Sequence, residues 1–246
     1  MLATAAVVTF VLTAIFAMAG VGAAVVLIPV FLALGVELHT AMATALLLNA
    51  IGMIVASVTF VRNGLVEWRL VVPMLIVAVL ASPLGVSVAR GIERAPLLWL
   101  FVGFLLFAGL MMMFYQPVPR TERRTTAQTL TLGLPVGALA GFIGGLLGVG
   151  GGNIIVPALV AAGLEPRRAS ASASFVVIFA SLAGFAAHAP TAHVDPGLLG
   201  TTAAATVAGA ALGAWLASSR LRGDQLTRVI AVVLLAVAAK TGWGLL

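Results

Sequence analysis

The 246-residue chain contains no cysteine and few charged residues. Without cysteine there is no disulfide framework, no thiolate metal site and no cysteine nucleophile. Only 8% of the residues are charged and 62% are hydrophobic, whereas soluble domains carry about 25% charged residues. These few charged residues could not cover the surface of a water-soluble globule of this length. The composition therefore predicts an integral membrane protein.

The chain also lacks the motifs of the common enzyme classes. There is no GxSxG, no HExxH, no GxxxxGK[ST] and no pair of acids inside an apolar run. We therefore do not expect an enzyme, a bound metal or cofactor, or ATP-driven transport. The net charge of +6 comes from 13 basic residues that separate the apolar runs without forming one basic face. This distribution is typical of membrane-protein loops and argues against nucleic-acid binding.

Eight apolar runs without interior charge follow one another, in two sets of four. They cover approximately residues 2–35, 38–61, 70–89, 96–115, 129–164, 169–189, 197–217 and 226–246. Their length and composition predict an all-α protein. The only obvious linker is 117–128, which would divide the chain into a first repeat, 1–116, and a second repeat, 129–246.

An internal repeat supports this division. When the chain is shifted by 128 residues, the segment that starts at Gly20 aligns without a gap on the segment that starts at Gly148. Prolines, acids and rows of small residues then coincide, which chance alignment of apolar sequence rarely produces. The coinciding pairs include Pro29 with Pro157, Glu37 with Glu165, Glu67 with Asp195, and Gly85 with Gly213. We call two residues related by this offset repeat mates.

The first run of each half is too long for one membrane crossing. Residues 2–35 would extend about 51 Å as one helix at ~1.5 Å per residue, and the hydrocarbon core is only ~30 Å thick. The sequence predicts instead a pair of short helices that turns at the glycines near mid-membrane and leaves by the side of entry. A single bent helix is the alternative.

The distribution of basic residues discriminates between these alternatives. If both broken segments are re-entrant hairpins, each followed by three transmembrane helices, the two repeats are inverted. Ten of the 13 basic residues then lie on one side of the membrane and three on the other; full crossings would give six and seven. The positive-inside rule favours inverted repeats, with the 117–128 linker in the cytoplasm and both termini outside.

The stretch GFIGGLLGVGGGNIIVP, residues 141–157, has seven glycines among 17 residues. Breaking a helix there frees backbone N–H groups at the start of the next half-helix, and these donors can hold an anion without a buried arginine. The alternative is that the glycines only allow close helix packing. The candidate substrate-binding residues are Gly148, Gly150, Gly151, Gly152 and Asn153, with Gly20 and Gly22 in the first repeat and Thr44, Asn49 and Ser172 on the following helices.

Several polar residues have two interpretations each. Asn153 could cap its half-helix or contact an anion, and Asn49 could form an interhelical hydrogen bond or contact substrate. Thr44 and Ser172 are repeat mates that could donate to substrate or bond to their own helix. Glu37 and Glu165 are expected to cap helices, because an acid is favoured at a helix N-terminus. His39 and His188 could couple protons to transport, with His188 expected at the membrane interface.

These residues carry a resemblance to a known family. GLLGVGGGNIIVPALVAAGLEPRRASASASF, its weaker copy in the first half, and GLVEWRL at 64–70 resemble the sulfite exporter TauE/SafE family of membrane permeases. The first copy departs from the pattern at Ala23, Ala24 and Val25, and Asp195-Pro196 replaces an acid–tryptophan pair. The resemblance implies export of sulfite, sulfonates or related organic anions across the bacterial inner membrane.

We therefore expect a multi-pass secondary transporter for a small anion that works by alternating access around a midplane site. An anion channel or, less favoured, an intramembrane enzyme remain the alternatives. The expected partners are the anionic substrate and the lipid bilayer. The sequence leaves open a coupling proton or cation and a homodimer.

Overall fold

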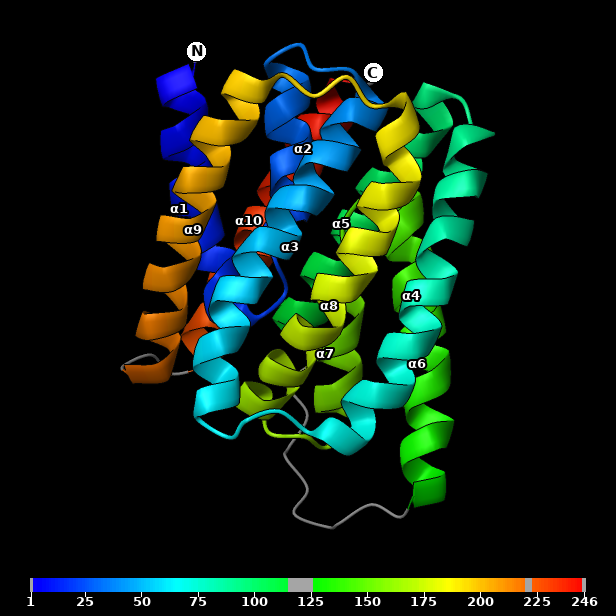
Figure 1. Cartoon of the computed structure of the whole chain (residues 1–246), viewed down its shortest axis with the longest axis vertical. Helices are drawn as coiled ribbons and strands as arrows, with labels where there is room; N and C mark the ends of the chain where they lie inside the picture. Colours follow the sequence, from blue (N-terminus) through cyan, green and yellow to red (C-terminus); the bar gives the residue numbers. More distant parts are fainter. Residues whose placement is uncertain (1, 115–125, 220–222, 245–246) are drawn as a thin grey trace.

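The computed structural model describes residues 2–114, 126–219 and 223–244 (Figure 1). The described residues form ten α-helices and one 3₁₀ helix, with no strand among them. This confirms the all-α prediction. The elements are α1 (Leu2–Ala19), α2 (Ala24–Ala33), α3 (Leu38–Arg62), α4 (Trp68–Arg90), α5 (Arg94–Phe114), α6 (Thr126–Leu147), α7 (Gly152–Ala161), α8 (Pro166–His188), the 3₁₀ helix η1 (Ala189–Thr191), α9 (Pro196–Ser219) and α10 (Gly223–Trp243).

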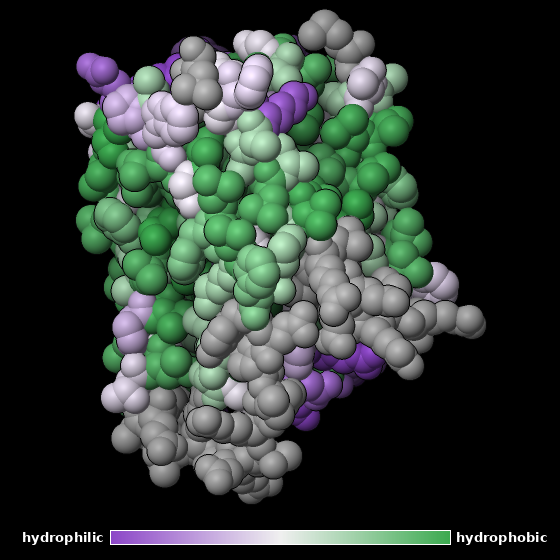
Figure 2. Space-filling view, turned by 180° about the vertical axis from the view of Figure 1, so that it is seen from behind, coloured by the Kyte–Doolittle hydropathy of each residue, from purple (hydrophilic) through white to green (hydrophobic). Residues whose placement is uncertain are grey.

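The outer surface of the helix bundle is apolar. Within the described residues, six helices are long and apolar enough to cross a membrane. Large apolar side chains on α4 and α5 point outward, including Leu80, Leu84 and Phe107, each more than 60% exposed. Figure 2 shows apolar side chains over the middle of one face, with hydrophilic ones toward its upper and lower ends. Such a surface is stable in lipid rather than in water, so the protein is an integral membrane protein.

Each broken segment consists of two helices rather than one bent helix. α1 runs from the upper end of Figure 1 downward and α2 returns to the upper end, whereas α6 and α7 make the same excursion from the lower end. The prediction of two short arms is wrong for the first arm. α1 has 18 residues and α6 has 22, so they are about 27 and 33 Å long at ~1.5 Å per residue. Only α2 and α7, with ten residues each, are short.

Helix packing follows the repeat. α1 packs against α9 and α4 packs against α6, so the first arm of each hairpin contacts a helix of the other half. A Cβ atom added at Gly85 would lie 2.0 Å from the carbonyl oxygen of Phe142, and one at Gly213 would lie 2.2 Å from that of Ala14. Gly213 and Ala14 are the repeat mates of Gly85 and Phe142. The small residues therefore allow close backbone contact at both places.

Both described ends of the chain lie at the upper end of the bundle in Figure 1. We call this the termini end, and the opposite end, where α5 stops and α6 starts, the linker end. The predicted linker falls outside the described residues up to residue 125, and residues 126–128 already belong to α6. α3 and α8 start at opposite ends of the bundle and pack against each other at its centre.

Candidate functional site

The turn of each hairpin is built on glycines in the left-handed region. Gly20 and Gly22 have φ of +68° and +78°, and their repeat mates Gly148 and Gly150 have φ of +72° and +75°. Residues with a Cβ atom adopt this conformation at a cost of roughly 1–2 kcal/mol. The repeat therefore preserves the backbone of the turn even where its flanking residues differ.

The two turns meet inside the bundle. A Cβ atom on Gly152, the first residue of α7, would lie 2.4 Å from the carbonyl oxygen of Val21 in the first turn. Cβ atoms on Gly22 and Gly150 would lie 2.0 and 2.5 Å from the side-chain amide of Asn49 on α3. The structure thus brings these four predicted residues, Gly22, Asn49, Gly150 and Gly152, to one place at the contact between the repeats.

The other turn glycines contact the helices around the turns. A Cβ atom added at Gly20 would lie 2.4 Å from the carbonyl oxygen of Ser170 on α8. One added at Gly148 would lie 2.8 Å from the Met42 side chain on α3. Ser170 and Met42 are themselves repeat mates. Gly151 has φ of +82° and is the N-cap residue of α7. These three glycines fix the turns in place.

Asn49 caps the second arm of the first hairpin. Its side chain is 2% exposed, and its Oδ1 accepts a hydrogen bond of 3.4 Å from the backbone N–H of Ala24, the first residue of α2. Its Nδ2 donates to Ser181 Oγ on α8 at 3.0 Å. Of the two interpretations of Asn49, the structure shows the interhelical hydrogen bond. Ser181 was not among the predicted residues.

The equivalent place in the second hairpin has no such cap. The repeat mate of Asn49 is Val177 on α8, which offers no acceptor, and its Cγ1 would lie 3.4 Å from a Cβ atom on Gly150. The first α7 residues with a backbone hydrogen bond are Ile154 and Ile155, which both donate to the carbonyl oxygen of Gly151. Within the described residues, the N–H groups of Gly152 and Asn153 are therefore free at the positive end of the α7 dipole.

Asn153 adds an unpartnered amide at this helix end. It is the second residue of α7, is 3% exposed, and neither its Nδ2 nor its Oδ1 has a hydrogen-bond partner among the described residues. Capping by Asn153 is therefore wrong, since the N-cap residue is Gly151 and no side chain caps α7. A buried polar group without a partner costs roughly 1–3 kcal/mol, so its retention calls for an explanation.

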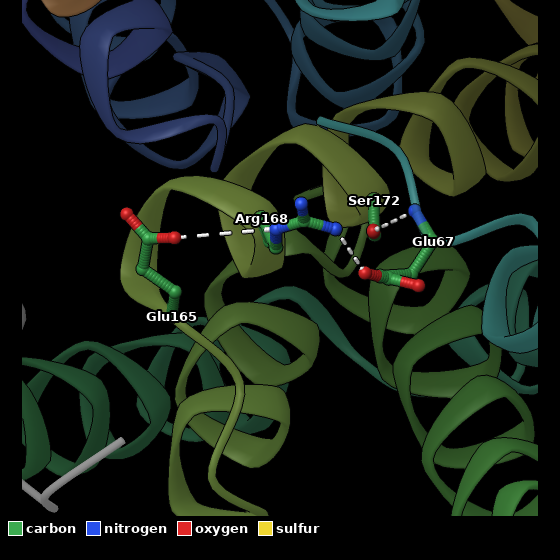
Figure 3. Close-up of polar contacts among 4 residues, drawn as sticks. All are labelled: Glu67, Glu165, Arg168 and Ser172. Atoms are coloured by element: carbon green, nitrogen blue, oxygen red, sulfur yellow. Dashed lines mark hydrogen bonds and ion pairs between the residues drawn. The ribbon is translucent and has the colours of Figure 1, made fainter. Parts of the chain in front are cut away.

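Thr44 and Ser172 have hydroxyls that are engaged away from the turns. Thr44 Oγ1 donates to the carbonyl oxygen of Thr40, one turn earlier on α3, at 2.8 Å. Ser172 Oγ accepts from the backbone N–H of Glu67 at 3.0 Å, which ties α8 to the loop before α4 (Figure 3). Neither hydroxyl is hydrogen-bonded to the glycine turns among the described residues, and substrate contact by either residue stays a prediction.

The two acids expected to cap helices differ. The Glu37 carboxylate accepts from the backbone N–H groups of His39 and Thr40 at 3.0 and 2.9 Å, so capping of α3 is confirmed. Burial raises the pKa of Glu37, but these hydrogen bonds and the charge of His39 hold that pKa below its ordinary value. Glu165 stands at the N-cap position of α8 without a side-chain cap bond, so capping by Glu165 is wrong. Its Oε2 lies 4.0 Å from Arg168 Nε instead.

A cavity of about 410 Å³ opens near Glu37 at the termini end. Thr40, Thr44, His193 and Asp195 also line it. We call it the outer vestibule. No group of three or more metal-ligating side chains occurs in the part of the chain that the structure describes.

His39 and His188 form a ring pair between α3 and α8. Their ring centroids are 5.9 Å apart. His188, the last residue of α8, is fully buried among neighbouring side chains. Its position at the membrane interface stays a prediction.

Comparison with known proteins agrees with this architecture. The family model described as "Sulfite exporter TauE/SafE" matches residues 5–241. A "Probable membrane transporter protein" of Haemophilus influenzae is 29% identical over 226 residues, which cover 92% of this chain and 88% of that protein. "Probable membrane transporter protein YunE" of Bacillus subtilis is 30% identical over 113 residues, 46% of this chain and 40% of that protein.

A plant relative matches more strongly over a shorter stretch. "Sulfite exporter TauE/SafE family protein 1" of Arabidopsis thaliana is 51% identical over 49 residues, which is 20% of this chain and 11% of that protein. The match of the family model extends over both hairpins and all the helices that pack around them. The chain is a membrane transporter that belongs to the sulfite exporter TauE/SafE family.

Proposed function

We propose that the protein exports a small oxyanion, of the sulfite or organic sulfonate class, across the bacterial inner membrane by alternating access. The anion would bind at the N-terminus of α7, between the two hairpin turns. The observation that carries this proposal is the buried amide of Asn153, which has no hydrogen-bond partner among the described residues and lies next to two free backbone N–H groups.

The chemistry of this helix end suits an anion. Two backbone donors, the Asn153 amide donor and the positive end of the helix dipole converge without a charged side chain, so an anion can bind without a buried arginine. The two hairpins differ here, because Asn49 occupies the corresponding position at α2. We therefore assign one anion to the second hairpin and a capping role to Asn49 in the first.

The relatives' names support transport. The 10-to-3 distribution of basic residues supports inverted repeats with the linker in the cytoplasm. A channel is the second candidate function. Saturable counterflow of radiolabelled sulfite in proteoliposomes would identify a carrier, whereas flux that rises linearly with concentration and lacks counterflow would identify a channel.

The test of the site is anion binding by the purified protein, measured by calorimetry with sulfite, sulfate, taurine and sulfoacetate. Asn153→Val copies the residue of the first repeat, Val25, and should weaken binding by about 1.5–3 kcal/mol, the typical contribution of a hydrogen bond to a charged group. Asn63→Val makes the same change at an exposed residue whose side-chain amide donates to the carbonyl oxygen of Thr59, and it should leave affinity unchanged. Equal affinity of wild type and Asn153→Val for every anion would refute the site.

Substitutions of Gly151 or Gly152 are less informative. A Cβ atom added at Gly151 would lie 2.5 Å from the carbonyl oxygen of Ala140, and one added at Gly152 would lie 2.4 Å from that of Val21. Loss of binding in such variants would therefore follow from a displaced backbone as readily as from a lost anion contact.

A further inference from the structure

The same four repeat positions occur at both ends of the α3–α8 pair, but their side chains make different contacts at the two ends. At the linker end these positions are Glu165, Arg168, Ser172 and Glu67, and at the termini end they are Glu37, Thr40, Thr44 and Asp195. The offset thus provides an internal comparison, because one sequence pattern has been built twice into one molecule.

At the linker end the four positions are joined to one another. The Arg168 guanidinium bonds to Glu67 Oε1 and lies 4.0 Å from Glu165 Oε2 (Figure 3). The Ser172 hydroxyl accepts the backbone N–H of the same Glu67. These contacts fasten the loop between α3 and α4 across the start of α8, so that the two halves are held together at this end.

At the termini end the same positions line the outer vestibule. Thr40 replaces the arginine, and no ion pair involves either acid among the described residues. The Glu37 carboxylate caps its own helix, and Asp195 Oδ1 accepts from the N–H of Leu198 at the start of α9. Two hydrogen bonds between the halves cross this end among the described residues. The His193 N–H donates to Thr40 Oγ1 at 3.3 Å, and the Arg90 guanidinium at the end of α4 donates to the carbonyl oxygen of Ala187 near the end of α8. A cavity of about 410 Å³ remains.

We propose that the Glu67–Arg168 ion pair is the gate that closes the linker end, and that the outer vestibule is its open counterpart. The structure is then the state that opens toward the end bearing both termini. In the opposite state, the Glu67–Arg168 contact separates and the vestibule at the termini end closes. This proposal rests on the transport function proposed above.

The gate must be weak enough to open. The Arg168 and Glu67 side chains are 45% and 39% exposed, and an ion pair of such exposure shifts an equilibrium by about two- to fivefold. Charge-assisted contacts of this size favour one state without locking it.

The test uses thiol labelling, because the chain has no cysteine of its own. The reporters are Leu198→Cys, which lines the outer vestibule, and Leu70→Cys, its repeat mate, which is 5% exposed. In detergent, where both ends are accessible, a charged thiol reagent should label Leu198→Cys faster. Equal rates, or faster labelling of Leu70→Cys, would overturn the proposal.

The gate itself is tested by exchanging residues between the repeats. Arg168→Thr should accelerate labelling of Leu70→Cys about two- to fivefold, and the charge swap Glu67→Arg with Arg168→Glu should restore the slow rate. Arg167→Thr is the matched control, since it removes the same charge from a neighbouring residue without an ion pair in the described part of the chain. An unchanged rate in Arg168→Thr, an equal acceleration in Arg167→Thr, or no restoration by the swap would overturn the gate.

A reverse variant guards against misfolding. Thr40→Arg places a guanidinium between Glu37 and Asp195 and should slow the labelling of Leu198→Cys, an effect opposite to that of unfolding. Labelling is measured without any anion, so a failed gate leaves the anion site untested by this experiment. Conversely, absence of anion binding by the wild type in calorimetry would refute the proposed function and leave the labelling result standing.

Discussion

Replacing Gly22 by alanine tests the packing of the first hairpin turn against Asn49. The added Cβ atom would lie 2.0 Å from Asn49 Oδ1, so the amide must move by more than an ångström. That movement breaks its hydrogen bonds with the N–H of Ala24 and with Ser181 Oγ. Gly22→Ala should therefore lower the free energy of unfolding through backbone strain and through lost hydrogen bonding.

Comparison with Gly35→Ala separates the loss of hydrogen bonding from the backbone strain. Gly35 has φ of +82°, close to the +78° of Gly22, but a Cβ atom there would meet nothing within 4 Å. The backbone strain, roughly 1–2 kcal/mol, is common to both variants and cancels. The remaining difference should be roughly 1–3 kcal/mol, the cost of leaving buried polar groups unpartnered.

The assay is reversible unfolding in mixed micelles, followed by circular dichroism. In an Asn49→Ala background the clash is absent, so Gly22→Ala should then cost no more than Gly35→Ala. Equal destabilisation by both glycine variants in the wild-type background would show that the turn does not depend on Asn49.

Two further predictions concern the helix cap and the topology. Glu37→Gln should lower the free energy of unfolding by about 1 kcal/mol at neutral pH, more than the same change at the uncapped mate Glu165. Because the folded pKa of Glu37 is depressed, its contribution is present above the unfolded pKa and disappears as pH falls through the folded pKa. A difference between wild type and Glu37→Gln that persists in acid would contradict this assignment. In sealed cells, an impermeant thiol reagent should label a cysteine introduced at Ala192 and miss cysteines at Arg167 and Thr126. Labelling at Arg167 while Thr126 stays protected would exclude the inverted topology.

Local sequence was sufficient to predict the hairpin turns. Gly20, Gly22, Gly148 and Gly150 stand where the apolar runs exceed one membrane thickness, and all four adopt positive φ. The start of the apolar run at residue 2 and the turn at Gly20 already imply an arm of 18 residues, as α1 has. The description of both arms as short was therefore wrong for α1.

Contacts between distant residues account for what the sequence did not reveal. Asn49 and Ser181 are 132 residues apart, so periodicity along one helix could not pair them. Glu37 and Glu165 occupy the same repeat position, two residues after Gly35 and Gly163, but Arg168 offers a guanidinium near Glu165 where Thr40 follows Glu37. Val177 is the repeat mate of Asn49 and has no acceptor. The N-terminus of α7 therefore has no side-chain cap, whereas that of α2 is capped by Asn49.

The most direct test of the central claim is the position of a bound oxyanion. Selenite has the charge and shape of sulfite, and its selenium scatters anomalously, so crystals of the protein with selenite would locate the anion without assumptions about binding residues. We predict one anomalous peak within hydrogen-bond distance of Asn153 Nδ2 and the backbone N–H of Gly152. A peak in the outer vestibule alone, or no peak near α7 under conditions in which calorimetry reports saturation, would contradict it.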